Sequence, residues 1–270
     1  MEINRSNITE IIEKSGLKPD KDYGQNYLLE PSICQRIVDL LEIQPGEKVL
    51  EIGPGIGSLT HFLSLHEDAY IDLVDIDDRM INFLKIIYKL EKMSLILSDI
   101  RKHDVCKYEK IVGNLPYNIT TETITYLLEN AKSAKRMVLM CQAEAFPHFS
   151  DVSGKEYGPA SILVHLLGSV SRKLTVKPGS FYPAPKCSSV VFQIDLDGSK
   201  NREEIFSIFN FSKSIFSNRR KTINNNLSNY LGNKELASNI LKSLDISENK
   251  RPEELSPEDF VRIYKQLKKY

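Results

Sequence analysis

The sequence predicts an α/β protein, with a doubly wound sheet domain followed by a smaller all-helical domain. Between about residues 48 and 196, short apolar runs rich in β-branched residues alternate with helical patterns, which is typical of a parallel sheet covered by helices. After the turn sequence Asp-Gly-Ser-Lys at 197–200, only helical patterns follow. We therefore expect a sheet domain at residues 1–197 and a helical domain at residues 198–270.

Each predicted strand is a short apolar run between turn residues, and each predicted helix repeats apolar residues every three or four positions. Ligands of a doubly wound sheet bind at the carboxyl ends of its strands. In the first domain we expect an N-terminal helical extension, strands at 48–52, 70–75, 94–97, 110–114, 136–142, 173–176 and 189–196, and helices at 58–65, 78–90, 121–130 and 160–170; in the second, helical patterns cover 203–216, 221–230, 234–244 and 257–267.

The charge of the chain is unevenly distributed. The 270 residues include 36 basic and 36 acidic side chains, and this zero net charge argues against a generally basic nucleic-acid binder. However, residues 1–197 hold 22 basic and 27 acidic side chains, a net charge of −5, whereas residues 198–270 hold 14 and 9, a net charge of +5. A basic helical domain points to a polyanionic partner.

The composition excludes several classes of protein. With 41% hydrophobic and 27% charged residues, the chain is not of the disordered or membrane type, and no apolar run approaches a membrane span. Its start lacks the layout of a signal peptide, and its four cysteines lack the spacing of a zinc site or a disulfide framework. The five histidines share no ligand spacing. We expect no metal, reduced thiols and a cytoplasmic location.

A glycine-rich turn follows the first strand of the sheet. Its glycines, Gly53, Gly55 and Gly57, allow positive φ and the close approach of a ligand. A dinucleotide-binding fingerprint would need a glycine where Ser58 stands, and the tighter loop is instead typical of methyltransferases that use S-adenosylmethionine. A structural turn without a ligand is the alternative.

The next two strands end in carboxylates. Asp75 lies 20 positions after Gly55, at the tip of the second strand, where a carboxylate can accept both hydroxyls of a ribose. Asp99 follows the third strand and can accept a hydrogen bond from an adenine amino group. Together these strand ends predict a nucleoside site without a phosphate-binding feature, which suits S-adenosylmethionine. The alternatives are a solvated strand end at Asp75 and a helix cap at Asp77 or Asp78.

The fourth strand ends in the most informative stretch, Asn-Leu-Pro-Tyr. The exocyclic amine of a base is a poor nucleophile because its lone pair is delocalised into the ring. If the side-chain oxygen of Asn114 and a main-chain carbonyl from Leu115-Pro116 accept its two N–H groups, the lone pair turns toward the methyl donor; Pro116 holds that carbonyl rigidly. Tyr117 can stack on the base. A strand-ending turn with a core tyrosine is the alternative.

With these motifs, the chain resembles the KsgA-type ribosomal RNA adenine N6-dimethyltransferases of the small subunit. The resemblance implies a Rossmann-like methyltransferase domain joined to a helical RNA-binding domain. The family usually has Glu where Asp75 stands. The similarity extends from Gly24 to about Leu227, and besides the strand ends it includes Gly-Gln-Asn-Tyr-Leu at 24–28, Glu-Ile-Gly-Pro-Gly at 51–55, Phe-Tyr-Pro-Ala-Pro-Lys at 181–186 and Asn-Arg-Arg-Lys-Thr at 218–222.

The resemblance implies roles for individual residues. Phe181 would give the target base a second aromatic face. Arg219, Arg220 and Lys221 would neutralise RNA phosphates, although a short basic run is otherwise just a solvated helix face. The implied catalytic residues are Asn114, Leu115, Pro116, Tyr117 and Phe181; the cofactor-binding residues are Gln25, Asn26, Leu28, Glu51, Gly53, Gly55, Asp75, Ile76, Asp99, Ile100 and Asn114; and the RNA-binding residues are Lys186, Arg219, Arg220 and Lys221.

The resemblance implies transfer of methyl groups from S-adenosylmethionine to N6 of two adjacent adenosines in the 3′-terminal stem-loop of small-subunit (16S) rRNA, with a role in small-subunit biogenesis. The partner is then the rRNA of the (pre-)30S subunit, and we expect a monomer. Two alternatives stay open. One is a large-subunit rRNA adenine dimethyltransferase of the macrolide-resistance type, and the other is a non-catalytic assembly or transcription factor on the same fold.

Overall fold

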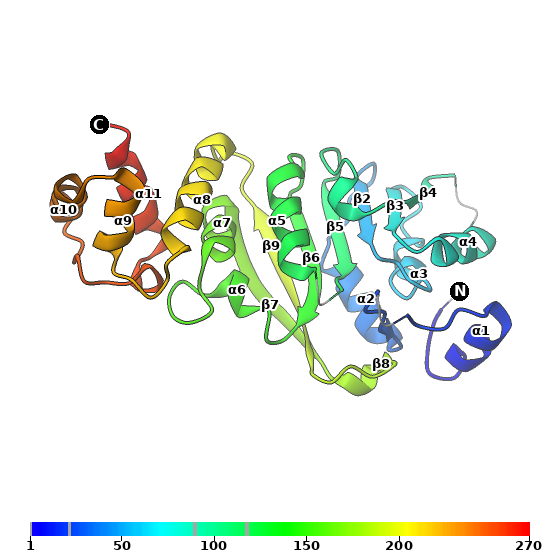
Figure 1. The fold of residues 1–270 in the computed structure, drawn as a ribbon. Helices are drawn as coiled ribbons and strands as arrows, with labels where there is room; N and C mark the ends of the chain where they lie inside the picture. Colours follow the sequence, from blue (N-terminus) through cyan, green and yellow to red (C-terminus); the bar gives the residue numbers. More distant parts are fainter. Residues whose placement is uncertain (1, 21–22, 89–90, 117–118) are drawn as a thin grey trace. The chain divides into compact units, whose positions relative to one another are not determined.

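A computed structural model describes residues 2–20, 23–88, 91–116 and 119–270 of the chain (Figure 1). The chain packs as two compact units, the first formed by Met1–Phe146 with Ser171–Gly198 and the second by Pro147–Val170 with Ser199–Tyr270. The second unit thus includes a segment that the sequence places in the sheet domain. The physical reason is burial, because Tyr157 and Ile162 belong to the same apolar core as the C-terminal helices.

A seven-stranded sheet forms the centre of the first unit (Figure 1). Its strand order is β4-β3-β2-β5-β6-β9-β7, and β4, β3, β2, β5 and β6 pair in parallel, which confirms the predicted α/β class. The carboxyl ends of these parallel strands therefore meet at one edge. The strand bounds are β2 Lys48–Ile52, β3 Tyr70–Asp75, β4 Met93–Leu97, β5 Lys110–Asn114, β6 Arg136–Gln142, β7 Gly168–Val176 and β9 Ser189–Leu196.

The last strands of the sheet differ from the prediction. β9 pairs antiparallel with β6, and β7 begins at Gly168 rather than at residue 173. A strand that is buried on both faces is a continuous apolar run whichever way it points, so the sequence of β9 contains no sign of its direction. Two further strands, β1 (Tyr27–Leu28) and β8 (Phe181–Tyr182), pair antiparallel outside the main sheet, and the sequence does not predict them.

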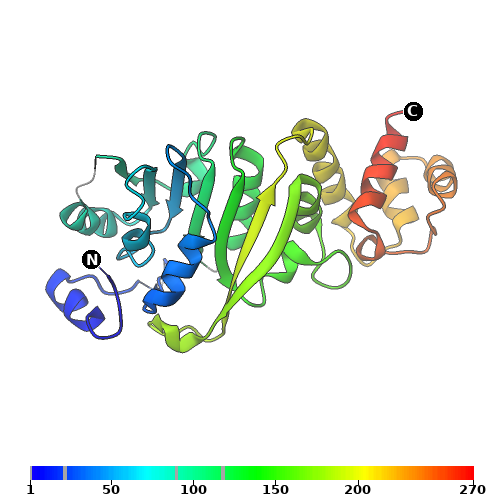
Figure 2. The same ribbon diagram turned by 180° about the vertical axis from the view of Figure 1, so that it is seen from behind.

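Helices cover both faces of the sheet, with α2 (Pro31–Asp39) on one face and α5 (Thr120–Asn130) on the other (Figures 1 and 2). The N-terminal helix α1 (Ile8–Ser15) instead packs beside the glycine-rich turn, because its isoleucines share an apolar cluster with Tyr27 and Ile56. The other elements of this unit are α3 Thr60–Leu63, α4 Asp78–Ile87 and the 3-10 helices Ile100–Lys102 and Pro178–Ser180. The predicted end of α4 at residue 90 lies outside the described residues.

The second unit is helical. The rings of Tyr157 and Phe216 meet edge-on at a centroid distance of 5.8 Å, and Phe216 stacks on Phe260 at 5.7 Å.

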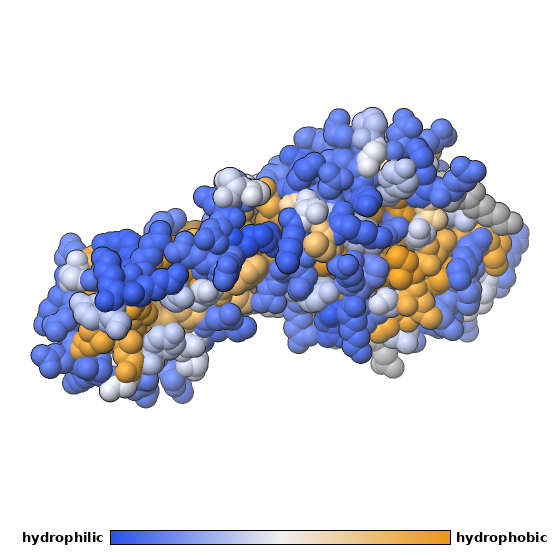
Figure 3. Space-filling view, turned by 90° about the horizontal axis from the view of Figure 1, so that it is seen from above, coloured by the Kyte–Doolittle hydropathy of each residue, from blue (hydrophilic) through white to orange (hydrophobic). Residues whose placement is uncertain are grey.

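Hydrophilic residues predominate on the face of the protein drawn in Figure 3. In the described parts of the chain, no helix combines the length and apolarity needed to span a bilayer. The helices are α6 Pro147–Ser150, α7 Pro159–Leu167, α8 Arg202–Phe216, α9 Ile223–Leu231, α10 Lys234–Ser243 and α11 Pro257–Leu267, with a 3-10 turn at Pro252–Glu254.

Candidate functional site

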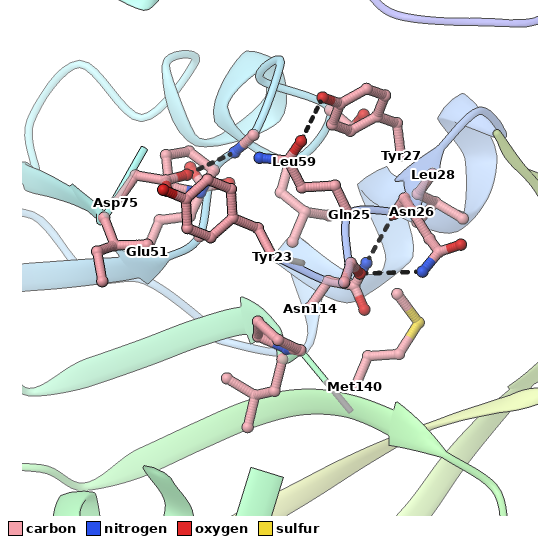
Figure 4. A pocket seen from close by; sticks show the side chains of 18 residues that line it. Tyr23, Gln25, Asn26, Tyr27, Leu28, Glu51, Leu59, Asp75, Asn114 and Met140 are labelled. Atoms are coloured by element: carbon pink, nitrogen blue, oxygen red, sulfur yellow. Dashed lines mark hydrogen bonds between the residues drawn. The ribbon is translucent and has the colours of Figure 1, made fainter. Parts of the chain in front are cut away.

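A pocket lies at the carboxyl edge of the sheet, where β3, β2 and β5 end side by side. Figure 4 shows Glu51 and Asp75 toward one side of this pocket and Asn114 and Met140 toward the other. The structure therefore brings together residues from distant parts of the sequence. The predicted site residues that line the pocket are Gln25, Asn26, Leu28, Glu51, Gly53, Gly55, Asp75, Ile76, Asn114, Leu115 and Pro116.

The loop after β2 places its main chain against Asp75. All three predicted glycines of this loop have positive φ, and a side chain at Gly55 would come within 3.2 Å of the Tyr27 ring. The main-chain N–H groups of Gly55 and Asp77 donate to the two carboxylate oxygens of Asp75, at 3.3 and 3.0 Å. The glycine loop and the end of β3 thus orient this carboxylate together.

Two buried carboxyl groups line the pocket. Glu51 on β2 is 1% exposed and accepts a hydrogen bond from the Thr60 hydroxyl at 2.7 Å, while Asp75 is 9% exposed. Burial raises the pKa of Glu51 to about 8 and the pKa of Asp75 to about 6, because water stabilises a carboxylate more than it stabilises the neutral acid. The Asp75 charge adds to the rise for Glu51. A ligand that brings positive charge or hydroxyl donors would stabilise the charged forms.

The Asn114 side chain, at the end of β5, is anchored by a main-chain group. Its Nδ2 donates to the carbonyl of Asn26 at 3.1 Å, so its Oδ1 is left to accept a hydrogen bond from a ligand. The following residue, Leu115, is 1% exposed, and its N–H donates to the carbonyl of Met140 on β6 at 3.0 Å. The N-terminal segment and a neighbouring strand thus hold this part of the site from both sides.

Asp77 connects the N-terminal segment to the edge of the sheet. Its carboxylate accepts hydrogen bonds from Nε2 of Gln25 at 2.8 Å and from the guanidinium of Arg79 at 2.6 Å. Burial alone would raise the pKa of Asp77, but these hydrogen bonds hold it below its ordinary value. Asp77 also accepts the N–H of Arg79 at the start of α4, so it has the capping role that the sequence offers as an alternative and positions Gln25 as well.

Four of the predicted catalytic and cofactor-binding residues are not among the described residues that line the pocket. Asp99 binds the guanidinium of Arg101 at 2.8 Å, and Ile100 is buried. Phe181 pairs with Leu28 across β1 and β8, and it is 4% exposed in an apolar cluster of the sheet, so its contact with a target base stays a prediction. Tyr117 lies outside the described residues.

The predicted RNA-binding residues differ in their surroundings. Arg219 forms an ion pair with Glu253 and donates to the carbonyl of Gly154 at 2.8 Å. Lys186, Arg220 and Lys221 are exposed, and none of their side chains has an ion pair or hydrogen bond to the described part of the chain. Arg219 therefore stabilises the helical unit. The local sequence of three basic residues does not reveal this role, because the partner Glu253 is 34 positions away.

The pocket also contains residues that sequence reasoning did not select. The hydroxyl of Ser58 is buried without a hydrogen-bond partner in the described residues, so it can meet a ligand. Met140 lies opposite Asn114 only through the register of β5 and β6, which no local pattern reveals. Across the described chain, no group of His, Cys, Asp and Glu side chains could hold a metal ion. The other unselected lining residues are Tyr23, Gly24, Tyr27, Pro54 and Leu59, of which Gly24 and Tyr27 stand in the quoted motif at 24–28.

The chain is similar to known proteins over nearly its whole length. It matches the family described as "Ribosomal RNA adenine dimethylase" over residues 16–269. It is 36% identical to ribosomal RNA small subunit methyltransferase A of Borreliella burgdorferi (strain ZS7), over all of this chain and 97% of that protein. The crystal structure of a dimethyladenosine transferase from Plasmodium falciparum superposes with a TM-score of 0.76 at 27% identity, covering 90% of this chain and 98% of that one. The 23S rRNA methyltransferase ErmE shares the fold, with a TM-score of 0.69 at 19% identity over 90% of this chain and 99% of that one.

The free energy of unfolding is expected to fall as the pH rises from about 5 to about 8. The pKa of Glu51 in the folded protein, about 8, lies above that of an unfolded glutamate, so unfolding releases a proton in this window. One such group contributes a slope of at most about 1.4 kcal/mol per pH unit. Urea denaturation across the window measures it. Glu51→Gln should flatten the dependence and the exposed Glu67→Gln should not; an unchanged slope in Glu51→Gln would contradict the assignment.

Proposed function

The chain belongs to the ribosomal RNA adenine dimethylase family of enzymes, and we propose that it transfers methyl groups from S-adenosylmethionine to N6 of two adjacent adenosines in the 3′-terminal stem-loop of small-subunit rRNA. It acts as a monomer in the cytoplasm, on the rRNA of the (pre-)30S subunit, and contributes to the biogenesis of that subunit. The observation that carries the proposal is Asn114, which is anchored to Asn26 at the edge of the pocket and begins Asn-Leu-Pro at a strand end.

The lining of the pocket fits S-adenosylmethionine. Its two desolvated carboxyl groups, Glu51 and Asp75, suit a ligand with positive charge and a ribose, and the Ser58 hydroxyl is buried without a partner in the described residues. When bound, this cofactor supplies an electrophilic methyl group on a positively charged sulfur. We assign Asp75 to the ribose hydroxyls. Asp99 stays a predicted contact of the adenine, with its carboxylate shared with Arg101.

The residues at the end of β5 activate the target amine. Oδ1 of Asn114 accepts one N–H of adenine N6, and the carbonyl of Leu115 accepts the other, because both lone pairs of the Pro116 carbonyl already accept hydrogen bonds, from the Thr120 hydroxyl at 3.0 Å and the Ile119 N–H at 3.3 Å. These bonds direct the nitrogen lone pair toward the methyl group, and catalysis is mainly positioning. The methylated nitrogen is acidic enough to lose its proton to water, so the site needs no special base. Tyr117 remains the predicted stacking residue.

We assign RNA contact in the helical unit to Arg220 and Lys221, and in the first unit to Lys186. All three side chains are exposed, and a cationic group in this position can neutralise a phosphate. Arg219 holds the segment of Arg220 and Lys221 in place, because its bonds to Glu253 and Gly154 connect this segment to other parts of the helical unit.

Purified protein incubated with labelled S-adenosylmethionine and undermethylated small subunits should yield N6,N6-dimethyladenosine after nucleoside digestion of the rRNA. Asn114→Ala should lower the transfer rate at least about 100-fold, because an acceptor that acts in the transition state is lost, while the protein still binds the cofactor. Asn130→Ala, which removes an amide bonded to the Tyr126 carbonyl on α5, is the matched control. Absence of the product from the wild-type reaction would refute the proposed function, and label in large-subunit RNA would support the large-subunit alternative. Full activity of Asn114→Ala would refute the role of Asn114 in transfer.

Arg219 and Arg220 should respond differently to substitution. Arg219→Ala should lower the free energy of unfolding by about 1 kcal/mol, because an ion pair and a hydrogen bond are lost. Arg220→Ala should leave stability unchanged and weaken binding to small subunits, with a shallower dependence on salt. Urea denaturation and filter binding at several salt concentrations measure both effects. Equal behaviour of the two variants would argue against this division of roles.

A further inference from the structure

One edge strand of the sheet in the first unit has only basic residues among its charged side chains. Residues 157–194 include four basic side chains and no acidic one, although residues 1–197 as a whole carry a net charge of −5. Arg172 and Lys173 lie on β7, and Lys177 follows it directly; all three are exposed. β7 is the last strand in the sheet order, and Figure 2 shows it in yellow-green along that edge.

Lys173 on β7 and Lys177 directly after it lie on the same exposed face of the chain. Successive side chains of a strand point to opposite sides, and from residue 171 to residue 177 the odd-numbered positions are exposed while Leu174 and Val176 pack in the core. Lys173, Thr175 and Lys177 therefore share one face, with the two lysines about 13 Å apart along the extended chain. Arg172 donates to the Thr175 hydroxyl at 2.7 Å, which keeps its guanidinium beside this face.

Charged side chains on an edge strand also prevent edge-to-edge pairing with other chains. That protection works with charge of either sign. Acidic residues make up half of the charged side chains of this protein, yet none stands between Glu156 and Asp195. Protection against edge-to-edge pairing does not require that all the charges on the edge strand be positive. A strand with only positive charges is, however, complementary to a polyanion.

The chain that follows Lys177 connects this edge to a segment that lines the pocket. From Lys177 the chain passes through Pro178–Ser180 into β8, which pairs with β1. The N–H of Leu29, directly after β1, donates to the carbonyl of Ser180 at 2.8 Å. Both residues of β1 line the pocket, so a polyanion on this edge would lie next to the segment that covers the candidate site.

We propose that Lys173 and Lys177, supported by Arg172, bind RNA phosphates on the first unit, as a contact separate from Arg220 and Lys221. The inference rests on the proposed function, because the bound polyanion is the small-subunit rRNA that carries the target adenosines. Phosphate contacts of this kind position the RNA and do not read its sequence.

The test compares two double variants of the full-length protein with equal changes in net charge. Lys173→Glu with Lys177→Glu should bind undermethylated small subunits about tenfold more weakly, and the slope of log affinity against log salt should fall by about 1.5, as expected when two phosphate contacts are lost. Lys85→Glu with Lys132→Glu changes two other exposed lysines of the same unit and should bind as the wild type does. S-adenosylmethionine affinity and urea denaturation should be unchanged in both, and the reversed charges still protect the edge strand.

Three results would overturn the inference. If the β7 variant binds small subunits with the affinity and salt slope of the Lys85 and Lys132 variant, only this inference fails. Equal weakening in both variants would show that net charge, and not this edge, is responsible. If the wild-type protein neither binds nor methylates small subunits, the proposed function fails as well, and the wild-type measurement therefore distinguishes the two failures.

Discussion

The hydrogen bond from the Asn114 side chain to the carbonyl of Asn26 is the contact on which the rest of the site depends. It joins two segments 88 positions apart and fixes which atom of the amide faces the pocket. The segment around Asn26 is in turn held by Gln25 on Asp77 and by the pairing of β1 with β8. The cofactor side and the amine side of the proposed reaction are therefore positioned by the same stretch of main chain.

The sequence predicted the parts of the site that each strand end contains by itself. Glycines with positive φ, the carboxylate of Asp75 and the amide of Asn114 all follow short apolar runs, and parallel pairing brings such ends to one edge. The features of the site that the sequence did not predict depend on contacts between residues far apart in the chain. Phe181 is buried in an apolar cluster that also contains Leu28, and Arg219 is occupied by a carboxylate 34 positions later. Neither contact changes the local pattern of the sequence.

The position of charges matters more here than their sum. Two of the acidic side chains of the first unit, Glu51 and Asp75, are buried at the pocket, in a site suited to a cationic ligand. The exposed edge strand has only positive charges. A count over residues 1–197 makes this unit look repulsive to RNA, whereas the structure separates an acidic interior site from a basic edge.

The second unit is assembled from two stretches of chain with the last strands of the sheet between them. The ribosome synthesises α7 before the C-terminal helices that share its apolar core, and domains generally fold from the N-terminus as they are made. The burial of Ile162 in this core is therefore complete only after Phe260 and Ile263 have left the ribosomal tunnel. The surface that presents Arg220 and Lys221 is complete only after the C-terminal helix has been translated, so the nascent chain has the sheet and its basic edge strand before it has the RNA contacts proposed for the helical unit.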